Sequence, residues 1–118
     1  MPKRRVLVVE DEYLVAMMIE DMLVELDCEV VGPANELQEA LGLAADGAFD
    51  FALLDLNLAG TDSYPVADAL TARGIRFAFV TGYEASHIRL AYRHHLLLQK
   101  PVALQDLERI LATADPPA

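Results

Sequence analysis

Five side chains that could transfer a phosphoryl group stand directly after short apolar runs of the sequence. They are Glu10 and Asp11 after residues 6–9, Asp55 after 51–54, Thr81 after 77–80, and Lys100 after 95–99. Three carboxylates held together repel one another, so at neutral pH they share protons or bind a cation. Oxygen ligands with few protein contacts suit Mg²⁺, whose coordination phosphate oxygens can complete. With that charge neutralised by a cation and Lys100, Asp55 could attack phosphorus in line, and Thr81 could donate a hydrogen bond to a phosphoryl oxygen.

The alternation of apolar and polar segments predicts the elements that position these side chains. We expect five strands at 6–9, 29–34, 51–54, 77–80 and 95–99, and five helices at 13–26, 37–47, 64–72, 84–93 and 104–112. Strands that alternate with helices pair in parallel through right-handed crossovers, with helices on both faces of one sheet. The predicted fold is therefore a three-layer α/β domain. All its strands end at the same edge, which brings the five side chains together.

Local signals add detail to three of these elements. Asn35 can cap the second helix, and Asp62 or Ser63 can cap the third. Pro33 indicates that strand 29–34 stops there or lies at an edge of the sheet. In the first helix, the apolar face is predicted from the helical spacing of Leu14, Met18, Met22 and Leu26.

Composition narrows the class of protein. The chain has 118 residues, enough for one domain spanning 1–118, with 114–118 as a tail or the start of a linker. Although 54% of the residues are apolar, no apolar run approaches the ~18–20 residues of a membrane helix. A single cysteine, Cys28, cannot form an internal disulfide, which fits a reducing cytoplasm. A net charge of -10 disfavours direct binding to nucleic acid. We expect a cytoplasmic protein without direct membrane or nucleic-acid contacts.

The sequence resembles the receiver domain of bacterial two-component response regulators. The residues that carry the resemblance are the stretches 8–11, 54–55, 80–82 and 100–101, together with Gly60. The resemblance implies a flavodoxin-like (βα)5 sandwich with sheet order 2-1-3-4-5, and phosphotransfer from a sensor histidine kinase to Asp55. It also implies Mg²⁺ held by Asp11, Asp55 and the backbone carbonyl of Asn57, with Glu10 acting through water. A cis peptide bond before Pro101, presenting Lys100, is expected by the same similarity.

One departure from the family concerns the switch that reads out phosphorylation. The family commonly has an aromatic residue three positions before the lysine, where this chain has Leu97. Residues 77–83, Phe-Ala-Phe-Val-Thr-Gly-Tyr, resemble an atypical subgroup with a Phe-Ala-Thr-Gly-Tyr-like motif and no such aromatic. We hypothesise that Tyr83, which follows Thr81 and Gly82, takes over part of the switching role. In this family the positions of Asn57 and Tyr83 also tune access of water to the phosphorylated aspartate.

Other readings of the same residues stay open at the level of sequence. A receiver could signal to a downstream protein or a second copy, through the surface of the fourth helix, fifth strand and fifth helix, or act as a phosphate sink. A degenerate receiver used only as a docking scaffold would be expected to lose the acceptor, the acidic residues or the lysine, and all are present. A small Mg²⁺-dependent phosphohydrolase usually has a second Asp two residues after its nucleophile, where this chain has Asn57. We expect no enzymatic activity beyond self-catalysed phosphotransfer and autodephosphorylation. His87, His94 and His95 raise the possibility of a phosphorelay, but the His94–His95 pair precedes the fifth strand, away from the site edge, and is expected to be a solvated pair at a helix end.

Overall fold

A computed structural model describes residues 3–82, 88–89, 92 and 96–113. Five parallel strands form one sheet in the order β2-β1-β3-β6-β7. The elements are β1 (Arg5–Val9), α1 (Tyr13–Glu25), β2 (Glu29–Ala34), α2 (Leu37–Asp46), β3 (Phe51–Asp55), β4 (Asn57–Leu58), β5 (Thr61–Asp62), α3 (Tyr64–Ala72), β6 (Arg76–Thr81), β7 (Leu96–Gln99) and α4 (Leu104–Thr113). The predicted α/β class and sheet order are confirmed, since β6 and β7 are the fourth and fifth strands of the sheet. Pro33 lies in β2 at an edge of the sheet, as predicted.

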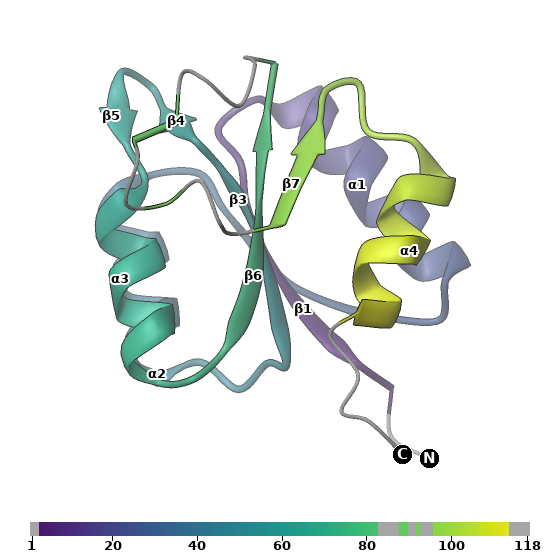
Figure 1. The fold of residues 1–118 in the computed structure, drawn as a ribbon, viewed down its shortest axis with the longest axis horizontal. Coiled ribbons are helices and arrows are strands. Elements are labelled where there is room, and N and C mark those ends of the chain that lie inside the picture. The colour runs from purple at the N-terminus through teal and green to yellow at the C-terminus, as the bar shows by residue number, and fades with distance from the viewer. Residues whose placement is uncertain (1–2, 83–87, 90–91, 93–95, 114–118) are drawn as a thin grey trace.

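Helices cover both faces of the sheet, with α2 and α3 on one face and α1 and α4 on the other (Figure 1). Successive residues of a strand point to opposite faces, so each strand contributes side chains to a hydrophobic core on each face of the sheet. Leu54 and Phe79 pack with α2 and α3, whereas Leu53 and Val80 pack with α1 and α4. Every residue of β3 is buried, which agrees with its apolar run without alternation.

A short antiparallel hairpin, β4–β5, follows β3 where the sequence indicated only a polar loop. Asn57 pairs with Asp62 and Leu58 with Thr61. The turn residues Ala59 and Gly60 have φ angles of 51° and 90°. A two-residue hairpin turn with positive φ at both positions matches the twist of its strands. Ala at the first turn position hides this signal, because Asn, Asp or Gly is the usual residue there.

The predicted apolar face of the first helix is wrong at Leu14 and Met18, whereas Met22 and Leu26 are half-buried and pack against the core. The buried residues of α1 are Ala16, Ile19 and Leu23, whereas Leu14 is 73% exposed and Met18 is also exposed. Residues spaced by four drift around a helix of 3.6 residues per turn, so such a stripe does not stay on one face. Since α1 is apolar on several sides, the stripe with small Ala16 faces the sheet, and Leu14 and Met18 of the other stripe remain in solvent.

Two predicted helix caps also differ from the structure. The N-cap of α2 is Glu36, and the N–H of Asn35 instead donates to Glu39 Oε1 at 3.0 Å. Ser63 does occupy the N-cap of α3, but its hydroxyl caps no backbone N–H. Ser63 is fully buried, and its Oγ has no hydrogen-bond partner among the described residues. Neither side chain therefore stabilises its helix in the predicted way.

The remaining boundaries lie close to the predicted ones. The last strand of the sheet begins at Leu96, and α1 ends at Glu25. The predicted helix 84–93, the three histidines and the tail 114–118 lie wholly or largely outside the described residues. Among the helices of the described part, none combines the length and apolar character that a membrane crossing requires.

Candidate functional site

The register of the sheet brings the ends of its strands together. Val9 of β1 pairs with Leu54 of β3, so the residues that follow, Glu10 and Asp55, lie side by side. Asp55 pairs with Val80, the neighbour of Thr81 in β6. The N–H of Lys100 donates to the carbonyl oxygen of Thr81 at 2.9 Å, which continues the pairing of β6 with β7. Four strands therefore deliver acidic, hydroxyl and ammonium groups to one edge.

Three carboxylates form a compact cluster at this edge. One oxygen each from Glu10, Asp11 and Asp55 lies within 4.8 Å of the others. Glu10 is 2% exposed and Asp55 is 6% exposed, whereas Asp11 is half-buried. Burial removes most of the water that would otherwise screen their repulsion, so the cluster needs a neutralising partner.

Lys100 supplies part of that neutralisation. Its Nζ lies 3.4 Å from Asp55 Oδ2, 3.2 Å from Glu10 Oε2 and 3.6 Å from Glu12 Oε1. Burial by itself lowers the pKa of Lys100, but the charges of Asp55 and Glu10 outweigh it, and the pKa is raised. The ammonium therefore stays charged beside Asp55.

One ammonium does not balance three carboxylates. Burial first, and then the charge of Glu10, raise the pKa of Asp55 from 3.8 to about 8, and Lys100 opposes them only in part. A proton on Asp55 at neutral pH is the consequence of this surplus of negative charge. A bound cation would displace that proton and leave Asp55 ionised.

The donor set fits a hard divalent cation. Glu10 Oε2 is buried and has no hydrogen bond among the described residues, although Lys100 lies nearby. The cavity at Asp55 has a volume of about 360 Å³, and three carboxylates, those of Asp11, Glu12 and Asp55, line it. Its lining residues are Asp11, Glu12, Asp55, Asn57, Thr81, Gly82 and Lys100. Few protein ligands and room for water and phosphate oxygens are the features that suit Mg²⁺.

Comparison with known families agrees with this geometry. Residues 6–112 match the model of the response regulator receiver domain. The chain belongs to this family. Receiver domains act in two-component signalling, and they are generally phosphoacceptors without an enzymatic activity of their own.

Solved structures and curated sequences include several similar receivers. The solution structure of SdrG from Sphingomonas melonis Fr1 is 41% identical with a TM-score of 0.86, over 97% of this chain and 98% of SdrG. The BeF3-activated conformation of SdrG, from Pseudomonas melonis Fr1, is 41% identical with a TM-score of 0.80, over 95% and 97% of the two chains. Transcriptional regulatory protein PdtaR of Mycobacterium tuberculosis is 36% identical over 72 residues. That match covers 61% of this chain but only 35% of PdtaR, so the similarity concerns a part of that longer protein.

The remaining residues singled out in the sequence have different places in this receiver. Asn57 and Gly82 line the acidic cavity. Leu97 is half-buried and packs against the core on the α2 and α3 side. Pro101 is exposed, and its peptide bond with Lys100 is cis, as expected. Tyr83 lies outside the described residues, so its role stays a prediction.

Two contacts of the site were missed at the level of sequence. Glu12 pairs with Lys100, a partnership that the acidic run Glu10-Asp11-Glu12 could have suggested. Asp11 Oδ2 accepts a hydrogen bond from the N–H of Ala59 at 3.0 Å. No sequence signal marks this second contact, because it depends on the unpredicted β4–β5 hairpin.

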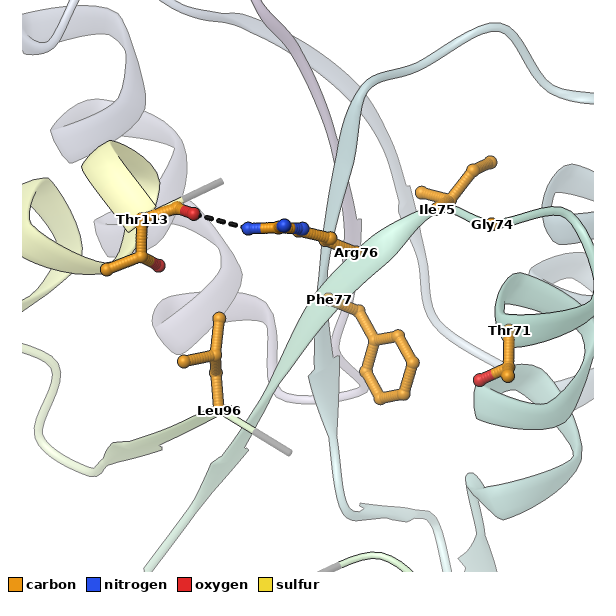
Figure 2. Close-up of a pocket in the computed structure, with 7 residues that line it drawn as sticks. All are labelled: Thr71, Gly74, Ile75, Arg76, Phe77, Leu96 and Thr113. Carbon is orange, nitrogen blue, oxygen red and sulfur yellow. Dashed lines mark hydrogen bonds between the residues drawn. The ribbon is translucent and has the colours of Figure 1, made fainter. Parts of the chain in front are cut away.

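A second hollow lies at the other end of β6 and is distinct from the acidic cavity (Figure 2). It has a volume of about 380 Å³ and is lined by Thr71, Gly74, Ile75, Arg76, Phe77, Leu96 and Thr113. The charged side chain among these residues, Arg76, donates through Nη1 to the carbonyl oxygen of Thr113 at 2.5 Å. Among the described residues, no carboxylate lines this hollow, so the acidic cavity remains the candidate site.

Proposed function

We propose that this receiver accepts a phosphoryl group on Asp55 from a sensor histidine kinase, in the presence of Mg²⁺. The observation that carries the proposal is the convergence of Glu10, Asp11 and Lys100 on one buried aspartate. Glu10 and Asp11 follow β1, Lys100 follows β7, and Asp11, Asp55 and Lys100 line one cavity. A turn aspartate without a chemical role does not require an ammonium and two further carboxylates around it.

The transfer follows from the groups present. An ionised oxygen of Asp55 attacks the phosphorus, and the bond from phosphorus to the histidine nitrogen of the donor breaks. The electron pair remains on the imidazole of the donor, which takes up a proton from solvent. Lys100 stabilises negative charge on the transferring oxygens, and the Thr81 hydroxyl donates a hydrogen bond to one of them.

Three residues of this receiver would hold the cation. Asp11, Asp55 and the backbone carbonyl of Asn57 are the proposed direct ligands, and Glu10 acts through water. Bound Mg²⁺ supplies positive charge that shields the incoming phosphoryl oxygens from the carboxylates. The buried Oε2 of Glu10 fits such an arrangement, because a metal-bound water could donate a hydrogen bond to it.

A protein donor has a place to dock beside the site. Tyr13, Leu14, Met17 and Met18 of α1 are exposed. A groove of about 260 Å³ lies next to them, between α1 and the loop that carries Lys100 and Pro101. Exposed apolar surface of this kind marks protein contacts. These features support a kinase domain as the donor. The cytoplasmic location, with no direct role for nucleic acid or a membrane, is proposed from the sequence alone.

We assign this receiver to the atypical subgroup that its Phe-Ala-Phe-Val-Thr-Gly-Tyr motif resembles, and we infer that its output mechanism is that of the subgroup. An aliphatic Leu97 cannot act as an aromatic switch, so another residue reports phosphorylation, with Tyr83 and Gly82 beside Thr81 as candidates. The signal passes to a downstream protein or a second copy, or the domain drains phosphoryl groups from its kinase. A phosphorylation-independent docking scaffold is the alternative that the following experiment separates.

The test uses a small phosphodonor, so it does not depend on knowing the kinase. Purified protein is incubated with acetyl phosphate and Mg²⁺, and intact mass spectrometry follows the gain of one phosphoryl group. We expect the gain in the unmodified protein and its loss in EDTA. Asp55→Asn keeps the size of the side chain but should abolish the gain.

The matched control is Asp46→Asn, which changes an exposed carboxylate at the end of α2 in the same way. This variant should be phosphorylated like the unmodified protein. Phosphorylation of Asp55→Asn at the same level would refute the assignment of the acceptor. No phosphorylation of the unmodified protein would favour the docking scaffold.

A further inference from the structure

Arg89, which lies between β6 and β7, is attached to the start of α3. The hydroxyl of Tyr64 accepts a hydrogen bond from the N–H of Arg89 at 3.1 Å. The guanidinium of Arg89 lies over the Tyr64 ring, 4.5 Å from its centroid, and also pairs with Asp62 at 3.1 Å. A cation over an aromatic face is attracted to it, so Arg89 has two attachments to one tyrosine.

Tyr92 is held by the same tyrosine. Its ring stacks on Tyr64 with centroids 4.4 Å apart and an interplanar angle of 25°. Its hydroxyl donates to Asp68 Oδ1 at 2.6 Å. Tyr64 is 5% exposed and also meets the edge of Phe79 in β6. The Tyr64 ring is buried between Phe79 of β6 and Tyr92. A displacement of this ring would move its neighbours, because packed interiors have few voids.

The β4–β5 hairpin connects Tyr64 to the acceptor site. At its start, the N–H of Asn57 lies 3.4 Å from Asp55 Oδ1. At its turn, the N–H of Ala59 donates to Asp11 Oδ2. The hairpin ends at Asp62, which pairs with Arg89, and Tyr64 follows two residues later. The hairpin is therefore attached to the carboxylates at one end and to Arg89 at the other.

The ring contacts on this face do not involve position 97. Leu97 packs against the same core that contains Tyr64 and Phe79, but it has no ring to stack. The contact between Tyr64 and Tyr92 is an aromatic pair that joins α3 to the residues beyond Thr81. It can report a movement of the hairpin without an aromatic at 97.

We propose that Tyr64 is the positioning residue that couples the chemical state of Asp55 to Ile88, Arg89 and Tyr92. The proposal rests on phosphorylation of Asp55 and deepens it by naming how the change is read out. A phosphoryl group moves negative charge from the carboxylate of Asp55 to the phosphoryl oxygens, so the N–H of Asn57 meets a different acceptor. The hairpin then shifts and carries Tyr64 relative to Arg89 and Tyr92. Such coupling requires that these contacts have two arrangements and that the state of Asp55 shifts the equilibrium between them.

The experiment compares ¹⁵N spectra with and without beryllofluoride and Mg²⁺ in the intact chain. Site amides are those of Thr81, Gly82 and Lys100, and distal amides are those of Ile88, Arg89 and Tyr92. We expect both groups to shift in the unmodified protein. In Tyr64→Leu the site amides should still shift, while the distal amides lose most of their shift. Tyr92→Phe, which keeps the ring stack and removes only the bond to Asp68, should retain the distal shifts.

The outcomes separate this inference from the proposed function. Distal shifts in Tyr64→Leu equal to those of the unmodified protein would overturn the role of Tyr64, as would site shifts without distal shifts in the unmodified protein. No site shifts in the unmodified protein would instead overturn phosphoacceptance and the coupling with it. Should Tyr64→Leu fail to fold, Tyr64→Phe removes only the acceptor for the Arg89 N–H. It should reduce the shift at Arg89 and spare Tyr92, and an unchanged shift at Arg89 would again refute the proposal.

Discussion

At the scale of single residues, the acidic site is governed by competition for negative charge. Lys100, a proton and a divalent cation can each neutralise the cluster of Glu10, Asp11 and Asp55. Coulomb interactions at these distances are strong in a partly buried site. Binding of one positive partner therefore lowers the affinity of the cluster for the other two. The types of residues in the cluster could be predicted from sequence. Their balance could not, because it depends on burial.

Removing the ammonium should therefore separate cation binding from phosphotransfer. Lys100→Met leaves a more negative site, so Mg²⁺ should bind about three- to tenfold more tightly. The same variant loses a group that stabilises the transferring oxygens, and phosphorylation by acetyl phosphate should slow by about 100-fold. Calorimetric titration with Mg²⁺ and timed mass spectrometry measure the two effects. Lys100→Arg keeps the charge and should leave Mg²⁺ affinity close to the original. Weaker Mg²⁺ binding by Lys100→Met would contradict the competition.

The raised pKa of Asp55 has a consequence for stability without a cation. The folded protein holds this proton up to about pH 8, whereas the unfolded chain loses it near 3.8. Between these values the folded state binds more protons, so the free energy of unfolding falls as pH rises. In EDTA, Asp55→Asn should remove this fall and be about 1–2 kcal/mol more stable than the unmodified protein at pH 8. The two proteins should differ less at pH 5.

Urea unfolding at both pH values measures this difference. Asp46→Asn, with an exposed carboxylate at the end of α2, should follow the unmodified protein at each pH. If Asp55→Asn is the less stable protein at pH 8, then attraction to Lys100 outweighs burial and repulsion by Glu10. That result would reverse the sign argued above.

At the scale of elements, the sequence predicted which segments form helices and strands better than which side chains they bury. The continuous apolar runs predicted β1 and β3 correctly, since strands buried on both faces show no alternation of apolar and polar residues. Helix α1 did not, because apolar residues on several sides leave its orientation to the shape of the sheet. The β4–β5 hairpin was missed because Ala59 stands where turn residues with a known preference for positive φ are usual.

The orientation of α1 can be checked with two leucines of the same helix. Leu23 is 0% exposed and packs against the sheet, whereas Leu14 points into solvent. Leu23→Ala should cost about 2–5 kcal/mol of unfolding free energy, since it leaves a cavity in the core. Leu14→Ala should change stability by about 0.5 kcal/mol or less. Urea unfolding of both variants compares them directly, and a larger loss for Leu14→Ala would restore the stripe predicted from sequence.

At the scale of the whole molecule, register decides what the sequence alone could not. Apolar runs that end in polar residues predicted one functional edge, but only the pairing of Val9 with Leu54 places Glu10 beside Asp55. The contacts of Arg89 with Asp62 and Tyr64 join residues 27 and 25 positions apart, and no local pattern announces them. Tertiary contacts of this kind depend on the complete arrangement of layers.

The molecule as a whole carries a net charge of -10, so its folded state is weakened by self-repulsion that any salt relieves. The specific Mg²⁺ binding that we propose adds to this relief only in the folded state, where the three carboxylates meet. At a free concentration 100 times its dissociation constant, Mg²⁺ should stabilise the protein by about 2.7 kcal/mol and raise the melting temperature by several degrees. Thermal unfolding in MgCl₂ and in NaCl of equal ionic strength separates binding from screening. Asp11→Asn removes a proposed ligand and should lose the excess given by MgCl₂ but keep the response to NaCl. An equal rise in both salts for the unmodified protein would mean that the acidic cluster holds no cation.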